Sequence, residues 1–207
     1  MPLYKTITIN SQTTLYIWKI EESLDALSQD IKLTDHCQQR VDGMKSELHQ
    51  RGFMSVRHLL AEAGYTDHDL YYDPSGKPHL NDGKHISITH SFIFSGIIVS
   101  NQEVGIDIEM QRDKILRIAH KFTPFEEYRT LANTDAIIRK LTIVWGAKES
   151  LYKLYAQEGL NFLKHIDVQD FYFDDAKTTA SVTYDAAKST YDIYFLEFEG
   201  FTCVYGY

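Results

Sequence analysis

The sequence predicts an α+β fold, and two periodicities together with the spacing of turn residues predict it. Apolar and polar residues alternate as in strands in the segments 3–9, 14–20, 179–184, 191–198 and 201–205. Apolar residues recur at helical spacing in the segments 20–31, 39–63 and 135–157. Turn residues separate these segments, so helices and strands are mixed along the chain, and the topology is left open.

The composition is that of a chain with a substantial buried core. Of the 207 residues, 43% are hydrophobic, which is enough for one domain or for two small ones. Only four prolines and eleven glycines occur, so no long linker is expected.

The charge balance and the apolar runs limit the partners. The 29 acidic residues exceed the 21 basic ones, and a net charge of −8 argues against general binding to nucleic acid or to an anionic membrane. The first residues lack the apolar core of a signal peptide, and no apolar run is long enough to span a bilayer, so a cytoplasmic protein is expected. Cys37 and Cys203 fit no metal or redox spacing, and free thiols are expected there rather than a disulfide.

The first part of the chain is expected to begin with a strand pair followed by a helix. A second helix is expected over residues 39–63, where Gly64 supplies the C-terminal stop. Arg51 and Arg57 would flank the apolar stripe of this helix.

Turn residues predict hairpins in the middle of the chain. Residues 73–76 and 81–83 are turn sequences on either side of a short segment, and a strand is expected at 85–89. A further hairpin is expected over residues 96–109, with its polar turn at Asn101 and Gln102.

After residue 110 the period becomes helical. Thr123 and Glu126 have the spacing of a capping box, so a helix is expected to begin at Thr123. Another long helix, over residues 135–157, should end at Gly159, and the remaining segments from residue 166 onward are expected to be strands.

Strand alternation places two carboxylates on one face of the segment 104–109. Asp107 and Glu109 share this face with Gly105, and the residues between them are apolar and point the other way. Same-face residues lie about 7 Å apart along a strand, and carboxylate side chains can close that separation around one hard cation. Gly105 leaves the face bare beside Asp107, which suits close approach by a ligand. Taken alone, the pattern is more typical of a solvated strand face. A metal site would therefore also require a second motif elsewhere in the chain.

The second motif is the segment Trp145-Gly146-Ala147-Lys148-Glu149-Ser150-Leu151-Tyr152-Lys153 of the predicted helix 135–157. At about 100° per residue, Glu149 and Lys153 project away from the apolar stripe and neighbour each other one turn apart. Taken alone, such a pair is typical of an exposed helix face and adds only about 0.2–0.5 kcal/mol to helix stability.

Taken together, Gly105-x-Asp107-x-Glu109 and Trp145-x-x-Lys148-Glu149-Ser150-x-x-Lys153 resemble the signature of the 4'-phosphopantetheinyl transferases. Gly76-Lys77-Pro78 and Ile88-Thr89-His90-Ser91 are similar to segments of the larger, monomeric type that activates surfactin synthetase. The resemblance covers roughly residues 51–153. It implies a holo-[acyl-carrier-protein] synthase activity, in which the 4'-phosphopantetheine moiety of coenzyme A moves to a serine of an apo acyl or peptidyl carrier protein and 3',5'-ADP leaves.

The resemblance also implies roles for the acidic residues and for Lys153. Asp107, Glu109 and Glu149 match the residues that bind the metal on the coenzyme A pyrophosphate, and three carboxylates suit Mg²⁺. Lys153 matches the closing lysine of the family, which can stabilise the transferring phosphoryl group or handle the serine proton. Glu149 is the alternative general base, and we favour it over Lys153.

Coenzyme A carries a 3'-phosphate as well as a pyrophosphate, so an acidic protein must gather cations locally to bind it. The resemblance assigns Lys77, Thr89 and His90 to coenzyme A, with Lys153 from the second motif. Arg51 is a further candidate, but Arg51 and Arg57 are both weaker candidates, because the helix that carries them aligns loosely with the family. Taken alone, His90 is more typical of a hydrogen-bonded structural residue.

Two positions depart from the family pattern. Thr89 stands where a serine is usual, but it keeps a hydroxyl for contact with phosphate. Gly146 also replaces a serine, and a glycine inside a helix costs about 0.5–1 kcal/mol relative to alanine. We expect Gly146 to allow close packing against the strand that bears Asp107.

The family's fold, as the resemblance implies it, consists of two similar α+β halves in a pseudo-twofold arrangement, with coenzyme A in the cleft between them. The expected halves are residues 1–100, on the side of the coenzyme A nucleotide, and residues 101–207, with the metal-binding and catalytic motifs. No internal sequence repeat is visible, and a monomer is expected.

Other interpretations stay open. Paired carboxylates on a strand also serve other Mg²⁺-dependent phosphoryl or nucleotidyl transferases, although the sequence has no Walker-type glycine loop. The chain could also be a catalytically inactive module that binds coenzyme A or a carrier protein, but it retains all three carboxylates and Lys153. Fatty-acid, polyketide and peptide synthesis all remain possible pathways.

Overall fold

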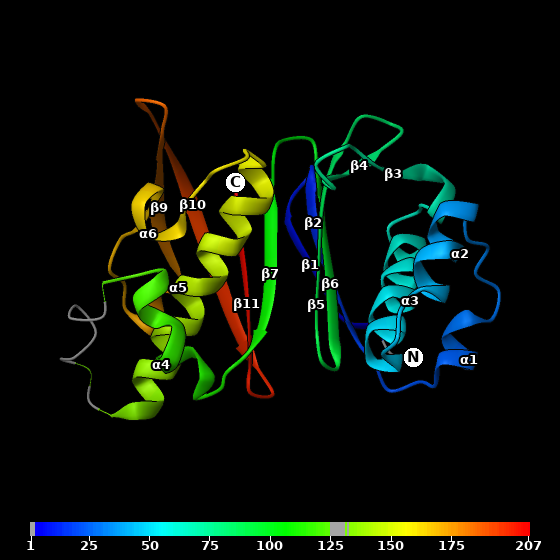
Figure 1. Ribbon diagram of the computed structural model, residues 1–207, viewed down its shortest axis with the longest axis horizontal. Helices are drawn as coiled ribbons and strands as arrows, with labels where there is room; N and C mark the ends of the chain where they lie inside the picture. Colours follow the sequence, from blue (N-terminus) through cyan, green and yellow to red (C-terminus); the bar gives the residue numbers. More distant parts are fainter. Residues whose placement is uncertain (1–2, 125–130, 132) are drawn as a thin grey trace. The chain divides into compact units, whose positions relative to one another are not determined.

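Two antiparallel sheets, one in each half of the chain, organise the structure (Figure 1). The computed structural model describes residues 3–124, 131 and 133–207. The chain divides into two units, Met1–Glu103 and Val104–Tyr207, and each unit has its own hydrophobic core. No helix in the described part of the chain is both long enough and apolar enough to cross a membrane.

The first unit contains a six-stranded sheet with the order β1-β2-β6-β5-β4-β3. Its strands are β1 (Leu3–Asn10), β2 (Thr13–Lys19), β3 (Leu70–Tyr72), β4 (Pro78–Leu80), β5 (His85–Ser91) and β6 (Phe94–Ser100). Its helices are α1 (Leu24–Ser28), α2 (Asp35–Asp42), α3 (Glu47–Glu62) and the short η1 (Asp67–Asp69). Helix α3 packs on β2, β5 and β6, because its apolar stripe, which includes Leu59 and Leu60, is buried there.

The second unit contains a five-stranded sheet with the order β7-β11-β10-β9-β8. Its strands are β7 (Gly105–Met110), β8 (Ile166–Val168), β9 (Lys177–Tyr184), β10 (Ala187–Phe198) and β11 (Phe201–Gly206). Its helices are α4 (Lys114–Ile118), α5 (Thr134–Tyr155), α6 (Phe162–His165) and the short η2 (Ala119–Lys121) and η4 (Phe173–Asp175). Asn133 caps α5 by accepting a hydrogen bond from the Ala136 amide at 2.9 Å, and the helix packs on β7 and β11.

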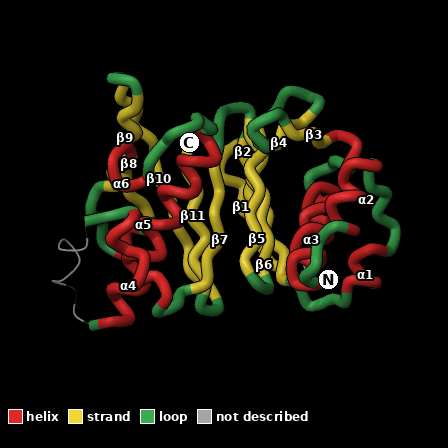
Figure 2. The backbone as a smooth tube through the Cα atoms, in the orientation of Figure 1, coloured by secondary structure: helices red, strands yellow, loops and turns green. Residues whose placement is uncertain are grey.

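The helices and strands follow one another in the same order in the two units. Figure 2 distinguishes the helices from the strands by colour. In the first unit β2 is followed by helices and then by β3, β4, β5 and β6, and β6 pairs with β2. In the second unit β7 is followed by helices and then by β8, β9, β10 and β11, and β11 pairs with β7. Strand β1 is an addition to the first unit. The expected α+β class with two similar halves is therefore confirmed, although the sequence shows no repeat.

Two sequence-based expectations about elements are wrong. The helix expected over residues 39–63 is two helices, because Gly43 ends α2 and α3 begins only at Glu47. The hairpin expected over residues 96–109 does not exist, because β6 pairs with β5 and β2 whereas β7 pairs with β11 in the other sheet. The polar residues Asn101 and Gln102 lie at the end of the first unit and not in a hairpin turn.

The structure also describes the two cysteines and Arg57, which lie outside the candidate site. Cys37 and Cys203 are free and buried, as expected. Arg57 is a structural residue, because it is 3% exposed and pairs with Asp67 at 2.9 Å. The helix expected to begin at Thr123 falls mainly on residues 125–130, which lie outside the described residues.

Candidate active site

Strand β7 and helix α5 lie unusually close together because glycines stand at their contacts. A Cβ atom added to Gly105 would lie 1.9 Å from the carbonyl oxygen of Ser150 on α5. The patch beside Asp107 that the sequence suggested was bare for a ligand is thus filled by the helix backbone. Gly146 on α5 permits close packing on the neighbouring strand β11, since its added Cβ would lie 2.7 Å from Cγ2 of Val204, whereas Oδ2 of Asp107 on β7 would be at an ordinary contact distance of 3.8 Å.

The contact at Gly146 gives a first testable prediction. Gly146→Ser, which introduces the serine usual in the family that the sequence resembles, is expected to lower the free energy of unfolding by about 1–3 kcal/mol, because the new side chain overlaps Val204. Val204→Ala removes the overlapping methyl groups. The double variant should therefore lose less free energy of unfolding than the two single variants lose together, and the difference is a coupling energy of about 0.5–3 kcal/mol. Urea unfolding of the four proteins measures this coupling, and additive losses would contradict it.

Asp107 and Lys153 form the central ion pair of the second unit. Lys153 Nζ lies 2.8 Å from Oδ1 of Asp107, and it also donates to the Ile106 carbonyl oxygen at 2.9 Å. Asp107 is only 5% exposed, whereas Lys153 is half-buried. The face of α5 that carries Glu149 and Lys153 therefore lies against β7, and it is not the exposed face that the helical pattern alone suggested.

Two further carboxylates share this environment. Burial raises the pKa of Glu149 from its ordinary value of 4.5 to about 7, and the negative charge of Asp107 adds to the effect, while Lys153 opposes it. Burial and the charge of Asp107 also raise the pKa of Glu109. Each of these carboxylates is thus destabilised in its charged form, and a bound cation would relieve that cost.

The raised pKa of Glu149 predicts how stability depends on pH without a metal. The folded protein holds this proton more tightly than the unfolded chain, so the stabilisation is complete below pH 4.5 and is lost as the pH rises to about 7. We therefore expect the free energy of unfolding of the wild type, minus that of Glu149→Gln, to fall across this window. Urea unfolding of both proteins in EDTA at several pH values checks this, and a difference that stays constant would contradict it.

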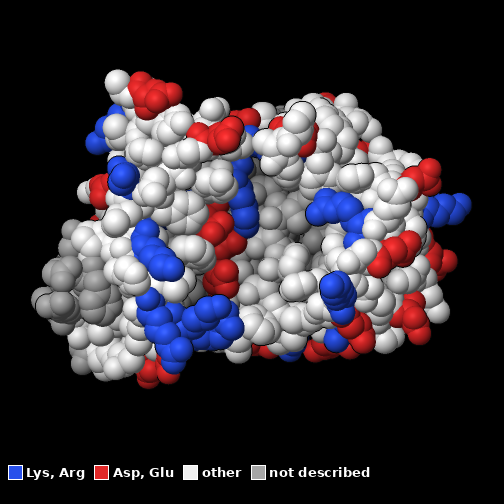
Figure 3. All heavy atoms as spheres, viewed as in Figure 1, with Lys and Arg blue, Asp and Glu red and all other residues white. Residues whose placement is uncertain are grey.

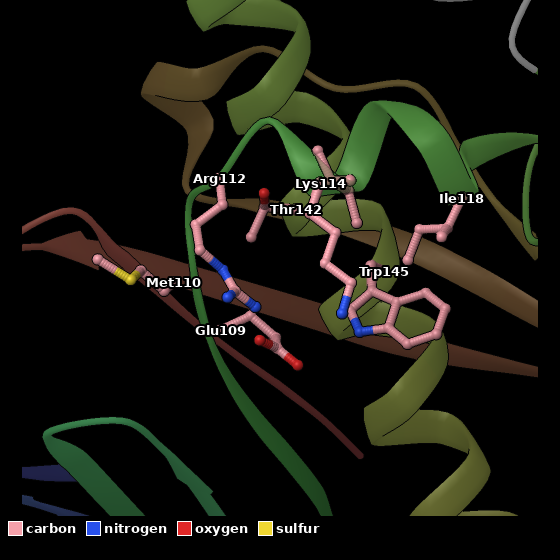
Figure 4. A pocket seen from close by; sticks show the side chains of 8 residues that line it. Glu109, Met110, Arg112, Lys114, Ile118, Thr142 and Trp145 are labelled. Carbon is pink, nitrogen blue, oxygen red and sulfur yellow. The ribbon is translucent and has the colours of Figure 1, made fainter.

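A pocket of about 160 Å³ lies beside Glu109 (Figure 4). The side chains of Arg112, Lys114 and Trp145 point toward the same space as the Glu109 carboxylate. Burial raises the pKa of Glu109, whereas the Trp145 indole and the charge of Arg112 both lower it. The sequence reasoning missed Arg112 and Lys114, although their place directly after the Asp-x-Glu strand is a signal that could have found them.

Basic side chains gather over α4 on the face shown in Figure 3, next to acidic ones. Helix α4 itself supplies Lys114 and Arg117, and Arg112 precedes it. In a chain of net charge −8, this local excess of cations stands out as a place for an anionic group.

The first-unit residues expected to bind coenzyme A fall into two places. The His90 ring lies on α3, where an added Cβ of Gly52 would be 3.2 Å from its Cγ and Nδ1 atoms, and Arg51 is the neighbouring residue of that helix. Thr89 precedes His90 but is only 5% exposed. Lys77 pairs with Glu103 at 2.7 Å.

Lys77 and His90 lie at opposite ends of strand β5. Glu103, the partner of Lys77, also lies 3.4 Å from Nδ1 of His85, the first residue of the strand, and His90 is five residues further along. Five residues of strand span about 17 Å. The structure thus places His90 against α3 beside Gly52, whereas the Arg51 guanidinium donates to the Ile20 carbonyl oxygen at 3.2 Å and Lys77 lies at the other end of the strand.

The three carboxylates are chemically suited to Mg²⁺. Oxygen donors are the ligands that this ion prefers. Besides burial, the charge of Asp107 helps to raise the pKa of both Glu109 and Glu149, so both carboxylates lie within electrostatic range of Asp107. Among the described residues, however, no three side chains of Asp, Glu, His or Cys are close enough to hold an ion as they stand. Closing the carboxylates around an ion therefore requires their side chains to rotate.

The second unit is thus an α+β unit with an Asp-x-Glu strand packed against a Glu-Lys helix. Residues 103–203 match the sequence model of the 4'-phosphopantetheinyl transferase superfamily. The match spans almost the whole second unit, so this unit is similar to that superfamily, as the two motifs predicted.

A relative of known class extends the similarity. The 4'-phosphopantetheinyl transferase gsp of Aneurinibacillus migulanus is 30% identical over 131 residues, which are 62% of this chain and 53% of that protein. The aligned part of this chain therefore spans about half the length of the relative. The alignment is longer than the second unit, so it includes part of the first.

Proposed function

We propose that this protein transfers the 4'-phosphopantetheine moiety of coenzyme A to a serine of an apo acyl or peptidyl carrier protein, in a reaction that depends on Mg²⁺. The serine oxygen forms a bond to the phosphorus that carries pantetheine, the pyrophosphate bond breaks, 3',5'-ADP leaves, and the serine proton is released. The observation that carries the proposal is the gathering of Asp107, Glu109, Glu149 and Lys153 between β7 and α5, inside the matched residues 103–203.

The proposed site residues have three roles: metal binding, stabilisation of the phosphoryl group and binding of coenzyme A. Asp107, Glu109 and Glu149 would hold the metal, and Mg²⁺ bound there would neutralise charge on the pyrophosphate. Lys153 carries a positive charge beside Asp107 and can donate to an oxygen of the transferring phosphoryl group. Arg51, Lys77, Thr89 and His90 are proposed as coenzyme A residues of the first unit.

Glu149 is our candidate for the acceptor of the serine proton. A carboxylate whose pKa is raised to about 7 is poised to gain and lose a proton near neutral pH, whereas an unshifted glutamate is almost fully ionised there. Because Glu149 also belongs to the proposed metal-binding set, a bound cation would lower this pKa. Lys153 already donates to two oxygens, which suits charge stabilisation better than proton removal.

Intact-mass spectrometry tests the proposal directly. A panel of apo carrier proteins is incubated with the protein, coenzyme A and Mg²⁺, with EDTA in a parallel set. A mass gain of one phosphopantetheine that EDTA abolishes is the expected result, and the carrier that gains it identifies the partner. No gain with any carrier, together with tight coenzyme A binding by calorimetry, would instead indicate an inactive binding module.

A further inference from the structure

Helix α5 contains two buried lysines, and they have different surroundings. Lys140 is 4% exposed, donates to the Phe171 carbonyl oxygen and lies over the Phe171 ring at 3.5 Å. Lys148, one residue before Glu149, is 3% exposed. A buried ammonium is costly unless its hydrogen bonds are satisfied, so the partners of Lys148 indicate what it does.

Lys148 joins three separate segments of the second unit. Its ammonium donates to the carbonyl oxygens of Phe122, Phe162 and Ile166 at 2.5, 2.9 and 2.6 Å. These residues lie after η2, in α6 and at the start of β8, so three donors of one ammonium connect three pieces of backbone.

Two of these three residues hold Trp145. The Phe122 ring meets the Trp145 ring edge to face at 5.0 Å, and the Phe162 ring meets it at 5.3 Å with a tilt of 55°. Trp145 in turn lines the same pocket as Glu109 (Figure 4), and its indole lowers the pKa of that carboxyl. Contacts of this kind fix the orientation of a metal-binding side chain, because a ligand without a fixed partner must be ordered when the ion binds.

We propose that Lys148 is a positioning residue of the carboxylate site: its ammonium fixes the backbones of Phe122 and Phe162, and their rings hold Trp145 against Glu109. The inference rests on the proposed function, because it takes Glu109 as a metal-binding residue. It gives the first lysine of the motif a role that differs from that of Lys153, which touches Asp107 directly.

Lys140 provides a matched control for the test. Lys140→Met and Lys148→Met both remove a buried positive charge from the same helix. The first leaves one carbonyl group and the Asp170 carboxylate without this donor, and the second leaves three carbonyl groups without it. Only the second change breaks the connection to Trp145. Both are made in a Trp18→Phe background, where Trp145 is the single tryptophan of the chain.

Two readouts are independent of transfer activity. The emission maximum and acrylamide quenching of Trp145 report how firmly its ring is held, and electron paramagnetic resonance of Mn²⁺ gives the Kd of the metal alone. We expect Lys148→Met to shift the emission to the red, to increase quenching about twofold and to raise the Kd for Mn²⁺ about 10- to 100-fold. Lys140→Met should change each value by less than about twofold from the parent.

The outcomes separate the inference from the proposed function. Equal emission and equal Kd in the two lysine variants would overturn the inference while the metal site stands, whereas a parent protein that binds no Mn²⁺ would overturn the metal assignment and the inference with it. Where Lys148→Met does not fold, Trp145→Phe decides, because it keeps one aromatic ring at this place and removes the rest of the indole, including its N–H, from the pocket beside Glu109. A rise of about tenfold in its Kd for Mn²⁺ is expected, and an unchanged Kd would overturn the inference.

Discussion

Asp107→Ala and Glu149→Gln are each expected to reduce phosphopantetheine transfer by about 10²- to 10³-fold or more, with the fold intact. Glu149→Gln keeps the shape of the side chain and removes an ionisable group whose pKa is raised to about 7, first by burial and then by the charge of Asp107. Asp107→Ala removes the partner of Lys153, which is 2.8 Å away, and leaves the three-carboxylate set incomplete. Initial rates with the carrier identified by mass spectrometry measure both effects.

The control for these two variants is Glu158→Gln. Glu158 is exposed and lies just beyond the C-terminal end of α5, so the same chemical change there should leave the rate within about twofold of the wild type. Circular dichroism and thermal unfolding establish that all variants are folded. Near wild-type turnover in folded Asp107→Ala or Glu149→Gln would contradict the assignment of the metal site.

The local part of the site was predictable from the sequence because its signals are local. Alternation in β7 placed Asp107 and Glu109 on one face, and helical spacing placed Glu149 one turn before Lys153. Neither pattern contains the pairing of Lys153 with Asp107, because those residues are 46 positions apart and meet only when α5 packs on β7. The resemblance to a family supplied that link in place of a physical derivation.

Strand partners were the part that local reasoning could not supply. A polar pair such as Asn101 and Gln102 can close a hairpin or join two units, and the sequence around it is the same in both cases. The true partner of β7 is β11, where Gly105 faces Gly206 about a hundred residues later. The sequence also did not predict the burial of Lys148. Lysines are mostly exposed, and the carbonyl groups that bind this one come from distant segments of the chain.

The structure assigns Gly105 a different role from the one that the sequence suggested. A glycine beside two carboxylates suggested open space for a ligand, because such a residue lets another group approach the backbone. The group that approaches is Ser150 of α5, whose carbonyl carbon and oxygen would lie 2.6 and 1.9 Å from an added Cβ. The glycine therefore sets the distance between the strand that carries Asp107 and the helix that carries Glu149.

Gly105→Ala is accordingly expected to lower the free energy of unfolding by about 3 kcal/mol or more. The atoms that the new methyl group meets belong to the backbone, so no side chain can rotate away, and α5 must shift as a whole. In the fraction that folds, Glu149 and Lys153 move away from Asp107, and a misplacement of about 1 Å can cost about 10²-fold in rate. Urea unfolding and transfer kinetics on the same preparation measure the two losses.

Gly43→Ala is the matched control for this change. Gly43 has a φ of −77°, and its added Cβ would meet only the carbonyl oxygens of Gln39 and Arg40, at 3.3 and 3.7 Å. The same methyl group should therefore alter stability there by no more than about 1 kcal/mol, in either direction. If Gly105→Ala were as stable and as active as Gly43→Ala, the close approach of α5 to β7 could not be what aligns the carboxylates, and the site would have to form by another arrangement of the helix.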